Sequence, residues 1–141
     1  MTANDDQPVS NPSTTSDIEA AILAANTAFY SAFNDHDLEA MAALWSSSPE
    51  LTCVHPGWNV LRGREAVIES WRAILGNPQQ PKIVGAAERA QLLGNVGPNT
   101  TALVVGRELV GGSPIAVTNV FVREGAAWKL LHHHASPIAG L

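Results

Sequence analysis

The sequence has few charges, and those it has lean to one sign. Of 141 residues, only 15% are charged, and eight Lys and Arg stand against thirteen Asp and Glu, which gives a net charge of −5. A protein that binds nucleic acid needs a basic surface for the phosphates, and no basic stripe is visible, so nucleic acid is not expected as a partner. The hydrophobic content of 45% is too high for a chain that is disordered throughout.

Other features are also missing. No apolar run reaches the ~18 residues of a membrane-spanning helix, so no membrane partner is expected. The single cysteine, Cys53, cannot form an internal disulfide, which fits a cytoplasmic location. Segment 1–16 contains no Lys or Arg and no long apolar run, so a secretory signal is not expected. Its composition predicts a disordered tail, and residues 17–141 are expected to form one domain.

The first half of this domain predicts helices. Ser16 and Glu19 form a capping-box pattern at the start of an amphipathic stretch with a period near 3.6 residues. Asp35 or Asp37 can cap a second, short helix. A third helix is expected over residues 64–75.

The second half predicts a sheet. A short strand is expected at 51–55, and four β-rich runs separated by turn-forming segments follow at roughly 82–93, 100–110, 114–123 and 127–136. Strands joined by tight turns are antiparallel. Helices followed by such strands predict an α+β fold, in which three helices pack on a strongly curved, mainly antiparallel sheet and close a cavity against it.

Alternation along the last strands predicts which side chains reach the cavity. Residues i and i+2 of a strand share a face, so His132, His134 and Ser136 lie together and His133 lies opposite them. We expect the first group to face the cavity and His133 to lie on the outer face. On the preceding strand, Asn119 is expected to face the cavity.

The segments that form these elements resemble a known superfamily. They are FYSAFNDHDLEAMAALW (29–45), CVHPGW (53–58), LRGREAVIESWRAIL (61–75) and VTNVFVREGAAWKLLHHHASP (117–137). Together they resemble the nuclear transport factor 2-like superfamily and, within it, the SnoaL-like branch related to ketosteroid isomerase, scytalone dehydratase and polyketide cyclases. The resemblance covers about residues 17–138. It implies a cystatin-like, cone-shaped barrel with a pocket at its mouth, and a homodimer formed through the outer face of the sheet.

The resemblance also implies roles for single residues. The pocket tyrosine of ketosteroid isomerase falls on Phe29, which has no hydroxyl, and the adjacent Tyr30 is turned by ~100° around the helix. The general-base aspartate falls on His55. The second oxyanion donor falls on Asn119, whose amide can donate at any pH. These departures exclude the isomerase itself and leave a related acid–base reaction run by histidines, closer to scytalone dehydratase.

We therefore expect an isomerase, dehydratase or cyclase type of step on a small hydrophobic carbonyl or hydroxyl compound, with no cofactor. The expected catalytic residues are His55, Asn119, His132 and His134. The side chains expected to contact the ligand are Trp58, Trp71, Phe29, Tyr30, Phe121 and Ser136.

Two alternatives stay open. The same fold can serve as a non-catalytic ligand-binding or dimerisation module. His55, His132 and His134 can also form a three-histidine metal site, because three imidazoles and an open position suit zinc.

Overall fold

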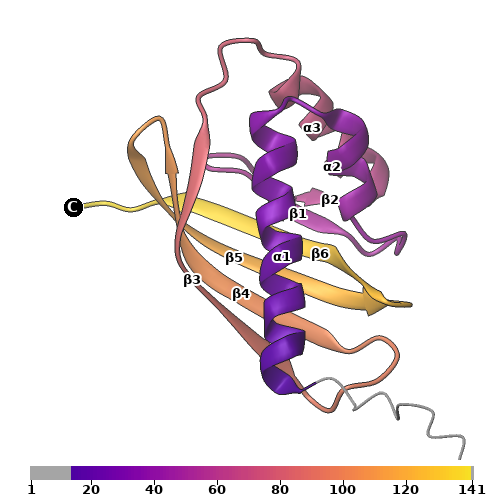
Figure 1. Ribbon diagram of the computed structural model, residues 1–141. Coiled ribbons are helices and arrows are strands. Elements are labelled where there is room, and N and C mark those ends of the chain that lie inside the picture. The colour runs from indigo at the N-terminus through magenta and orange to yellow at the C-terminus, as the bar shows by residue number, and fades with distance from the viewer. Residues whose placement is uncertain (1–13, 141) are drawn as a thin grey trace, which may run out of the picture.

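Three helices and six strands make up the described part of the chain, residues 14–140 of the computed structural model (Figure 1). The helices are α1 (Thr15–Asn34), α2 (Leu38–Leu44) and α3 (Arg64–Leu75). The strands are β1 (Thr52–Val54), β2 (Leu61–Arg62), β3 (Ile83–Leu93), β4 (Thr101–Val110), β5 (Ser113–Glu124) and β6 (Ala127–Pro137). The predicted α+β class is confirmed, and β2 is the one strand the sequence analysis did not identify. Most of the predicted tail, residues 1–13, lies outside the described residues.

Helix α1 begins earlier than the pattern at Ser16 and Glu19 predicted. The side chain of Thr14 accepts a hydrogen bond of 3.1 Å from the Asp17 N–H, and the Asp17 carboxylate accepts one of 3.3 Å from the Thr14 N–H. The capping box therefore forms two residues upstream, where both reciprocal bonds close, and Ser16 lies inside the helix.

Both ends of α2 are held by side chains. Asp37, one of the two predicted caps, accepts from the N–H of Ala40 at 3.0 Å. At the other end, the guanidinium of Arg64 donates at 2.9–3.1 Å to three backbone carbonyls, those of Ala42, Trp45 and Ser46. The Ala42 carbonyl lies in the last turn of α2 and the other two directly follow the helix, so this cation caps the end of α2 and joins α3 to it.

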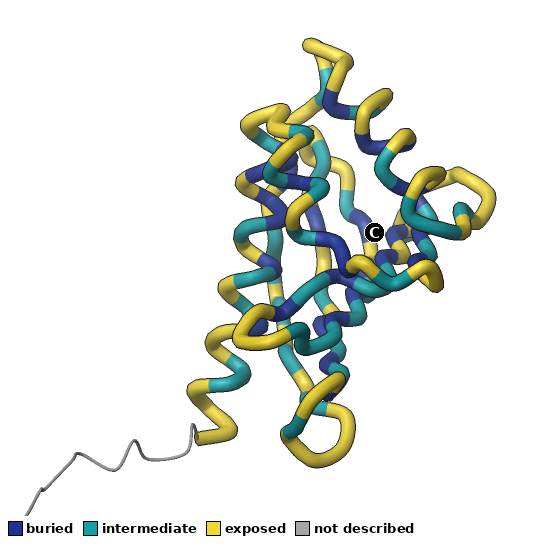
Figure 2. The backbone as a smooth tube through the Cα atoms, turned by 90° about the vertical axis from the view of Figure 1, so that its right-hand side faces the viewer, coloured by how far each residue is buried: buried dark blue, intermediate teal, exposed yellow. Residues whose placement is uncertain are grey.

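The strands form one sheet in the order β2-β1-β6-β5-β4-β3. All neighbours are antiparallel except β1 and β6, which are parallel. Helix α1 crosses one face of this sheet, and α2 and α3 lie beside one end of it (Figure 1). Figure 2 shows that the buried segments lie between the helices and the sheet, whereas the connecting loops are exposed.

A β-bulge interrupts β6. The consecutive residues Val120 and Phe121 of β5 pair with His132 and Leu130, which leaves Leu131 without a partner. An extra residue shifts every later side chain to the opposite face. Accordingly, the even-numbered positions of β6 are buried before the bulge, and the odd-numbered positions 133 and 135 are buried after it.

A second bulge interrupts β3. Ala87 and Glu88 together oppose Gly106 of β4, and Ala87 has a positive φ of 54°. A Cβ at Gly106 would lie 3.1 Å from the backbone of Ala86 and of Glu88, so glycine permits the close approach of the two strands. This bulge turns Glu88 toward the helix side of the sheet.

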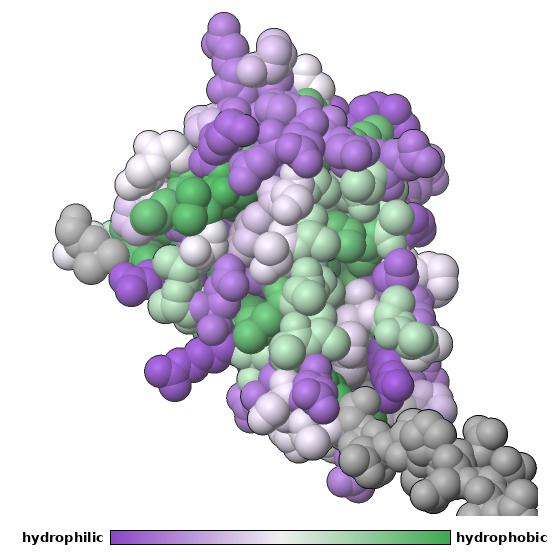
Figure 3. Space-filling view, viewed as in Figure 1, coloured by the Kyte–Doolittle hydropathy of each residue, from purple (hydrophilic) through white to green (hydrophobic). Residues whose placement is uncertain are grey.

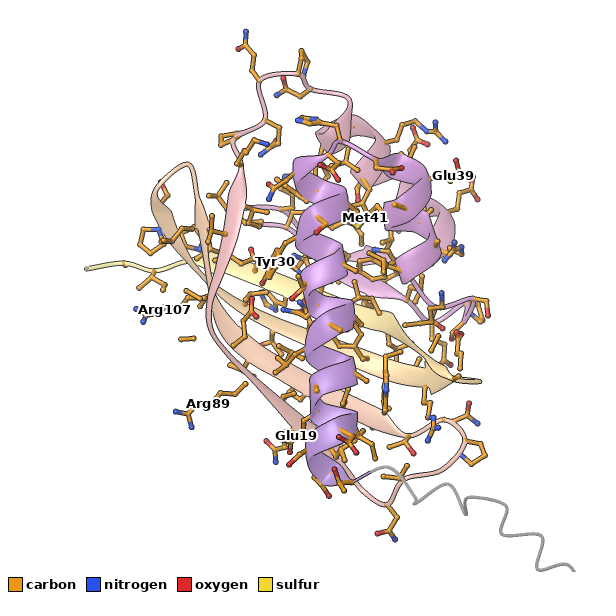
Figure 4. All side chains as sticks on the ribbon, viewed as in Figure 1. Glu19, Tyr30, Glu39, Met41, Arg89 and Arg107 are labelled. Carbon is orange, nitrogen blue, oxygen red and sulfur yellow. The ribbon has the colours of Figure 1, made fainter. Side chains whose placement is uncertain are left out.

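The outer face of the sheet carries both charged and apolar side chains. Arg89 and Arg107 project away from the helices (Figure 4), and Val84, Val105 and Leu109 are exposed. At the upper end of the molecule in this view, hydrophilic side chains gather over α2 and the segment between α3 and β3 (Figure 3). The homodimer through the outer face stays a prediction. None of the described helices is long and apolar enough to span a membrane.

Candidate functional site

A cavity of about 340 Å³ lies between the helices and one end of the sheet. Its wall is mostly apolar and includes Phe29, Phe33, Trp58, Trp71, Ile83 and Ile115. Among residues 14–140, the titratable side chains in the wall are His55, Glu108 and His133, and no Lys or Arg takes part in it. The volume is at the small end of the range for ligand pockets, ~300–1,000 Å³.

The structure places the predicted site residues in three groups. Four of them line the cavity: His55, Trp58, Trp71 and Phe29. Three are buried but do not form its wall: Asn119, Tyr30 and Phe121. Three lie on the outer face of the sheet: His132, His134 and Ser136.

The histidine of β6 that lines the cavity is His133, so the predicted orientation of the three histidines is wrong. Strict alternation from Trp128 would bring His132 and His134 inward, but the bulge at Leu131 reverses it, and His133 is only 2% exposed. The two successive leucines before the histidines are the sequence signal that could have revealed this break.

The proposed three-histidine metal site does not form. The sheet separates His55 from His132 and His134, so these imidazoles cannot share an ion. Within residues 14–140, no group of three or more His, Cys, Asp or Glu side chains is placed to hold a metal ion.

The position of the hydrogen on His55 is set by Ser70 of α3. The Ser70 hydroxyl donates to the Val67 carbonyl at 2.6 Å, and its oxygen lies 2.8 Å from Nε2 of His55. Because the hydroxyl has a single hydrogen, Nε2 of His55 must donate to it, and Nδ1 is left as an acceptor. Burial lowers the pKa of His55 to about 4, so this imidazole is neutral at pH 7.

Aromatic rings and a thiol surround His55. Its ring centroid lies 4.8 Å from that of Trp58 and 4.6 Å from that of Trp71, both in edge-on geometry. The Cys53 sulfur lies 3.6 Å from Nε2. Burial raises the pKa of Cys53 to about 12, so its thiol is protonated and unreactive at neutral pH. His55 is therefore the reactive group on this side of the cavity.

His133 is held by two carboxamides in series. Its Nδ1 lies 2.6 Å from Oδ1 of Asn119, and Nδ2 of Asn119 donates to Oδ1 of Asn26 at 2.7 Å. Because the Asn119 oxygen can only accept, His133 carries its hydrogen on Nδ1 and leaves Nε2 as an acceptor. Burial, together with the nearby His55, lowers the pKa of His133 to about 3. Both polar atoms of the Asn119 side chain are bonded to other side chains, and Asn119 does not line the cavity. It is therefore not placed to donate to a ligand carbonyl, in contrast to the prediction.

Glu108 of β4 is a polar wall residue that the sequence analysis missed. It is 2% exposed, and its Oε1 has no hydrogen-bond partner among residues 14–140. Burial raises the pKa of Glu108 to about 7. Alternation could have identified it, because Ala102, Val104 and Glu108 share the inward face of a regular strand.

Comparisons with known proteins agree with this architecture. Residues 22–140 match the family model of the SnoaL-like domain. The F-box protein SKIP8 of Arabidopsis thaliana is 31% identical over 116 residues, which are 82% of this chain and 49% of that protein. The chain therefore spans about half the length of this curated relative.

Two solved structures are also similar. A proposed dehydratase of the NTF2-like family from Streptomyces avermitilis is 30% identical with a TM-score of 0.75, over 90% of this chain and 100% of that one. A protein of cystatin-like fold from Caulobacter vibrioides is 20% identical with a TM-score of 0.68, over 84% of this chain and 88% of that one. The second likeness concerns the fold alone, and it confirms the predicted cystatin-like class.

Proposed function

The chain belongs to the SnoaL-like domain family, and we propose that it is a cofactor-independent acid–base enzyme for a small, mainly hydrophobic compound that carries a hydroxyl or carbonyl group. The reaction class is an isomerisation or an elimination of water. The observation that carries this proposal is the convergence of two buried, neutral imidazoles, His55 and His133, on one apolar cavity.

Each imidazole is prepared to accept a proton. Ser70 and Asn119 engage the hydrogens of His55 and His133, so each ring keeps one nitrogen with a free lone pair. Fixed orientation lowers the entropic cost of proton abstraction from a carbon beside a carbonyl. The lowered pKa values keep both rings unprotonated at pH 7. They also make each ring a weaker base, so the proton abstraction depends on the fixed orientation of the rings, and the imidazolium, once formed, gives its proton back readily.

The composition of the cavity wall favours a substrate that is flat, apolar and without negative charge. The rings of Phe29, Trp58 and Trp71 offer broad apolar surfaces. With no Lys or Arg in the wall, an anionic substrate would lose its hydration without gaining a counter-charge. The proposed dehydratase activity of the Streptomyces avermitilis relative makes elimination of water the first reaction to test.

The test is a screen of small β-hydroxy ketones, in which loss of water produces a conjugated enone that absorbs ultraviolet light. We expect His55→Gln and His133→Gln to lower kcat/KM by about a hundredfold or more, as is usual when a general acid or base is removed. His134→Gln is the matched control on the outer face of the same strand, and we expect it to leave kcat/KM within about twofold.

Two results would contradict the proposal. One is full activity in both inner-histidine variants. The other is a screen in which several β-hydroxy ketones raise the melting temperature of the protein but none is converted, which would favour the non-catalytic ligand-binding module instead.

A further inference from the structure

Three buried polar atoms that form no hydrogen bond within residues 14–140 lie close together at the cavity wall and just behind it. They are Nδ2 of Asn26, the hydroxyl of Tyr30 and Oε1 of Glu108. The Tyr30 hydroxyl lies beside both of the other groups, and Figure 4 shows Tyr30 on α1 next to the sheet. Most buried polar groups in folded proteins are paired, and these three lie in an order that lets Asn26 donate to the Tyr30 oxygen and the Tyr30 hydroxyl donate to Glu108. The cluster therefore orients the Glu108 carboxyl at the cavity wall.

The surroundings of Glu108 favour an uncharged carboxyl. The titratable groups that face it are Tyr30 from α1 and Glu88 from the bulge of β3, while His55 and His133 share the cavity with it. None of these is a cation at neutral pH. Glu88 repels a negative charge on Glu108, and burial also raises the pKa of Glu88 itself.

Gly85 of β3 permits this arrangement. A Cβ at this position would overlap the carboxylate of Glu88 and lie 2.5 Å from Cε2 of Tyr30. Glycine therefore allows the second carboxyl group and the phenol to meet beside Glu108.

We propose that Glu108 enters the cavity as a neutral carboxylic acid and donates its proton to a hydroxyl or carbonyl oxygen of the bound compound, with Tyr30 as its positioning residue. This inference rests on the proposed function and deepens it. The hydrogens of both wall imidazoles are already donated to Ser70 and Asn119, so Glu108 is the group in the described wall that can still transfer a proton. The unpaired indole N–H of Trp71 can donate a hydrogen bond to a ligand but cannot give up its proton. Strands β6 and β5 separate β1 from β4, so His55 and Glu108 reach the cavity from different sides.

For elimination of water, the step balances with these groups. An imidazole nitrogen of His55 or His133 takes the proton from the carbon beside the carbonyl, and the C–H electron pair becomes the new C=C bond. The C–O bond breaks as the leaving oxygen takes the proton of Glu108 and departs as water. The imidazolium then returns its proton to the Glu108 carboxylate, which restores both groups.

The first test uses two aryl compounds of similar size, para-fluoroacetophenone and para-fluoroethylbenzene, followed by fluorine NMR. We expect the wild-type protein to bind the ketone about tenfold more tightly than the hydrocarbon, as one hydrogen bond to a buried donor allows. Glu108→Gln keeps a neutral donor and should hold this ratio within about threefold. Glu108→Leu should reduce it to about one, and Glu39→Gln, a carboxylate exposed on α2, should not change it.

The pH dependence separates a donor from a mere packing residue. The ketone preference of the wild-type protein should fall as the pH rises through about 7, because the deprotonated carboxylate cannot donate. Glu108→Gln should keep its preference across this range. Since the Tyr30 hydroxyl lowers the pKa of Glu108, Tyr30→Phe should move the midpoint to higher pH.

The outcomes distinguish this inference from the proposed function. An unchanged ratio in Glu108→Leu, or a wild-type ratio independent of pH, would overturn the donor role of Glu108, and an unmoved midpoint in Tyr30→Phe would overturn the role of Tyr30. Dehydration that proceeds at the full rate in Glu108→Gln would overturn the acid role and leave the histidine mechanism standing. If neither aryl compound binds, both the ligand pocket and the inference are wrong.

Discussion

His133 and Asn119 occupy paired positions on β6 and β5, and a hydrogen bond of 2.6 Å joins Nδ1 of the ring to Oδ1 of the carboxamide. Both side chains are buried, and a second hydrogen bond, from Nδ2 of Asn119 to Oδ1 of Asn26 on α1, extends the network. The bond joins two neighbouring strands on the face of the sheet that carries the cavity. It fixes both the orientation of His133 and the nitrogen that carries its hydrogen.

Replacing Asn119 by Leu should lower the free energy of unfolding by about 1–3 kcal/mol, because the Nδ1 hydrogen of His133 and the Asn26 oxygen lose their partners inside the protein. Urea denaturation measures the loss, and nitrogen NMR of the imidazole should show a changed tautomer for His133. Thr118→Val, a neighbouring change on the outer face, should have an effect within about 0.5 kcal/mol. Equal stability of wild type and Asn119→Leu would contradict the buried bond.

The three consecutive histidines should differ in chemical reactivity. Diethyl pyrocarbonate acylates accessible neutral imidazoles, and His134 is exposed whereas His55 and His133 are 3% and 2% exposed. We expect mass spectrometry to find His134 acylated at least about tenfold faster than either buried ring, whose reaction must wait for local opening. Faster labelling of His133 than of His134 would show that the bulge of β6 is misplaced.

Stability should fall in mild acid. The pKa values of His55 and His133 are lowered from 6.5 to about 4 and about 3, so below pH 6.5 the unfolded state binds two protons that the folded state rejects. Glu108 acts in the opposite direction, because its pKa is raised from 4.5 to about 7 and the folded state takes up its proton first. The lowered pKa of His132 and the raised pKa of Glu88 act in opposite directions. The net difference of about one proton therefore predicts a loss of about 1.4 kcal/mol per pH unit near pH 5.5.

Urea denaturation around this pH checks that slope. His55→Gln should flatten it, because one of the two rejected protons disappears, and Glu108→Gln should steepen it, because the opposing group disappears. His134→Gln on the outer face should leave the slope unchanged. An unfolding free energy that rises as the pH falls would contradict the burial of the neutral rings.

Gly85 and Gly97 form a matched pair for testing the crowding behind the cavity. A Cβ at Gly85 would meet Glu88 and Tyr30, whereas a Cβ at Gly97 has no atom within 4 Å, and neither position has the positive φ that disfavours alanine. Gly85→Ala should therefore cost about 1–3 kcal/mol through overpacking, and Gly97→Ala should be within about 0.5 kcal/mol of wild type. Thermal denaturation of the two variants measures the difference, and equal melting temperatures would show that the space around Gly85 is not crowded.

The sequence alone predicted the α+β class and the helices and strands except the two-residue β2. Helical periodicity, capping residues and turn compositions are local, so they predicted α2, α3 and the four long strands nearly to their ends. The start of α1 was missed by a short distance, because Thr14 and Asp17 offer the same capping pattern as Ser16 and Glu19. Resemblance to the family placed His55 at the cavity.

Tertiary structure decided which polar side chains share that cavity. The pairing of β6 with β5 leaves Leu131 as an extra, unpaired residue. This bulge turns His133 inward and His132 and His134 outward. The same kind of bulge in β3 brought Glu88 beside Glu108. Register across strands depends on residues far apart in the chain, so local alternation predicts the existence of a strand reliably but not the face that each side chain takes beyond a bulge.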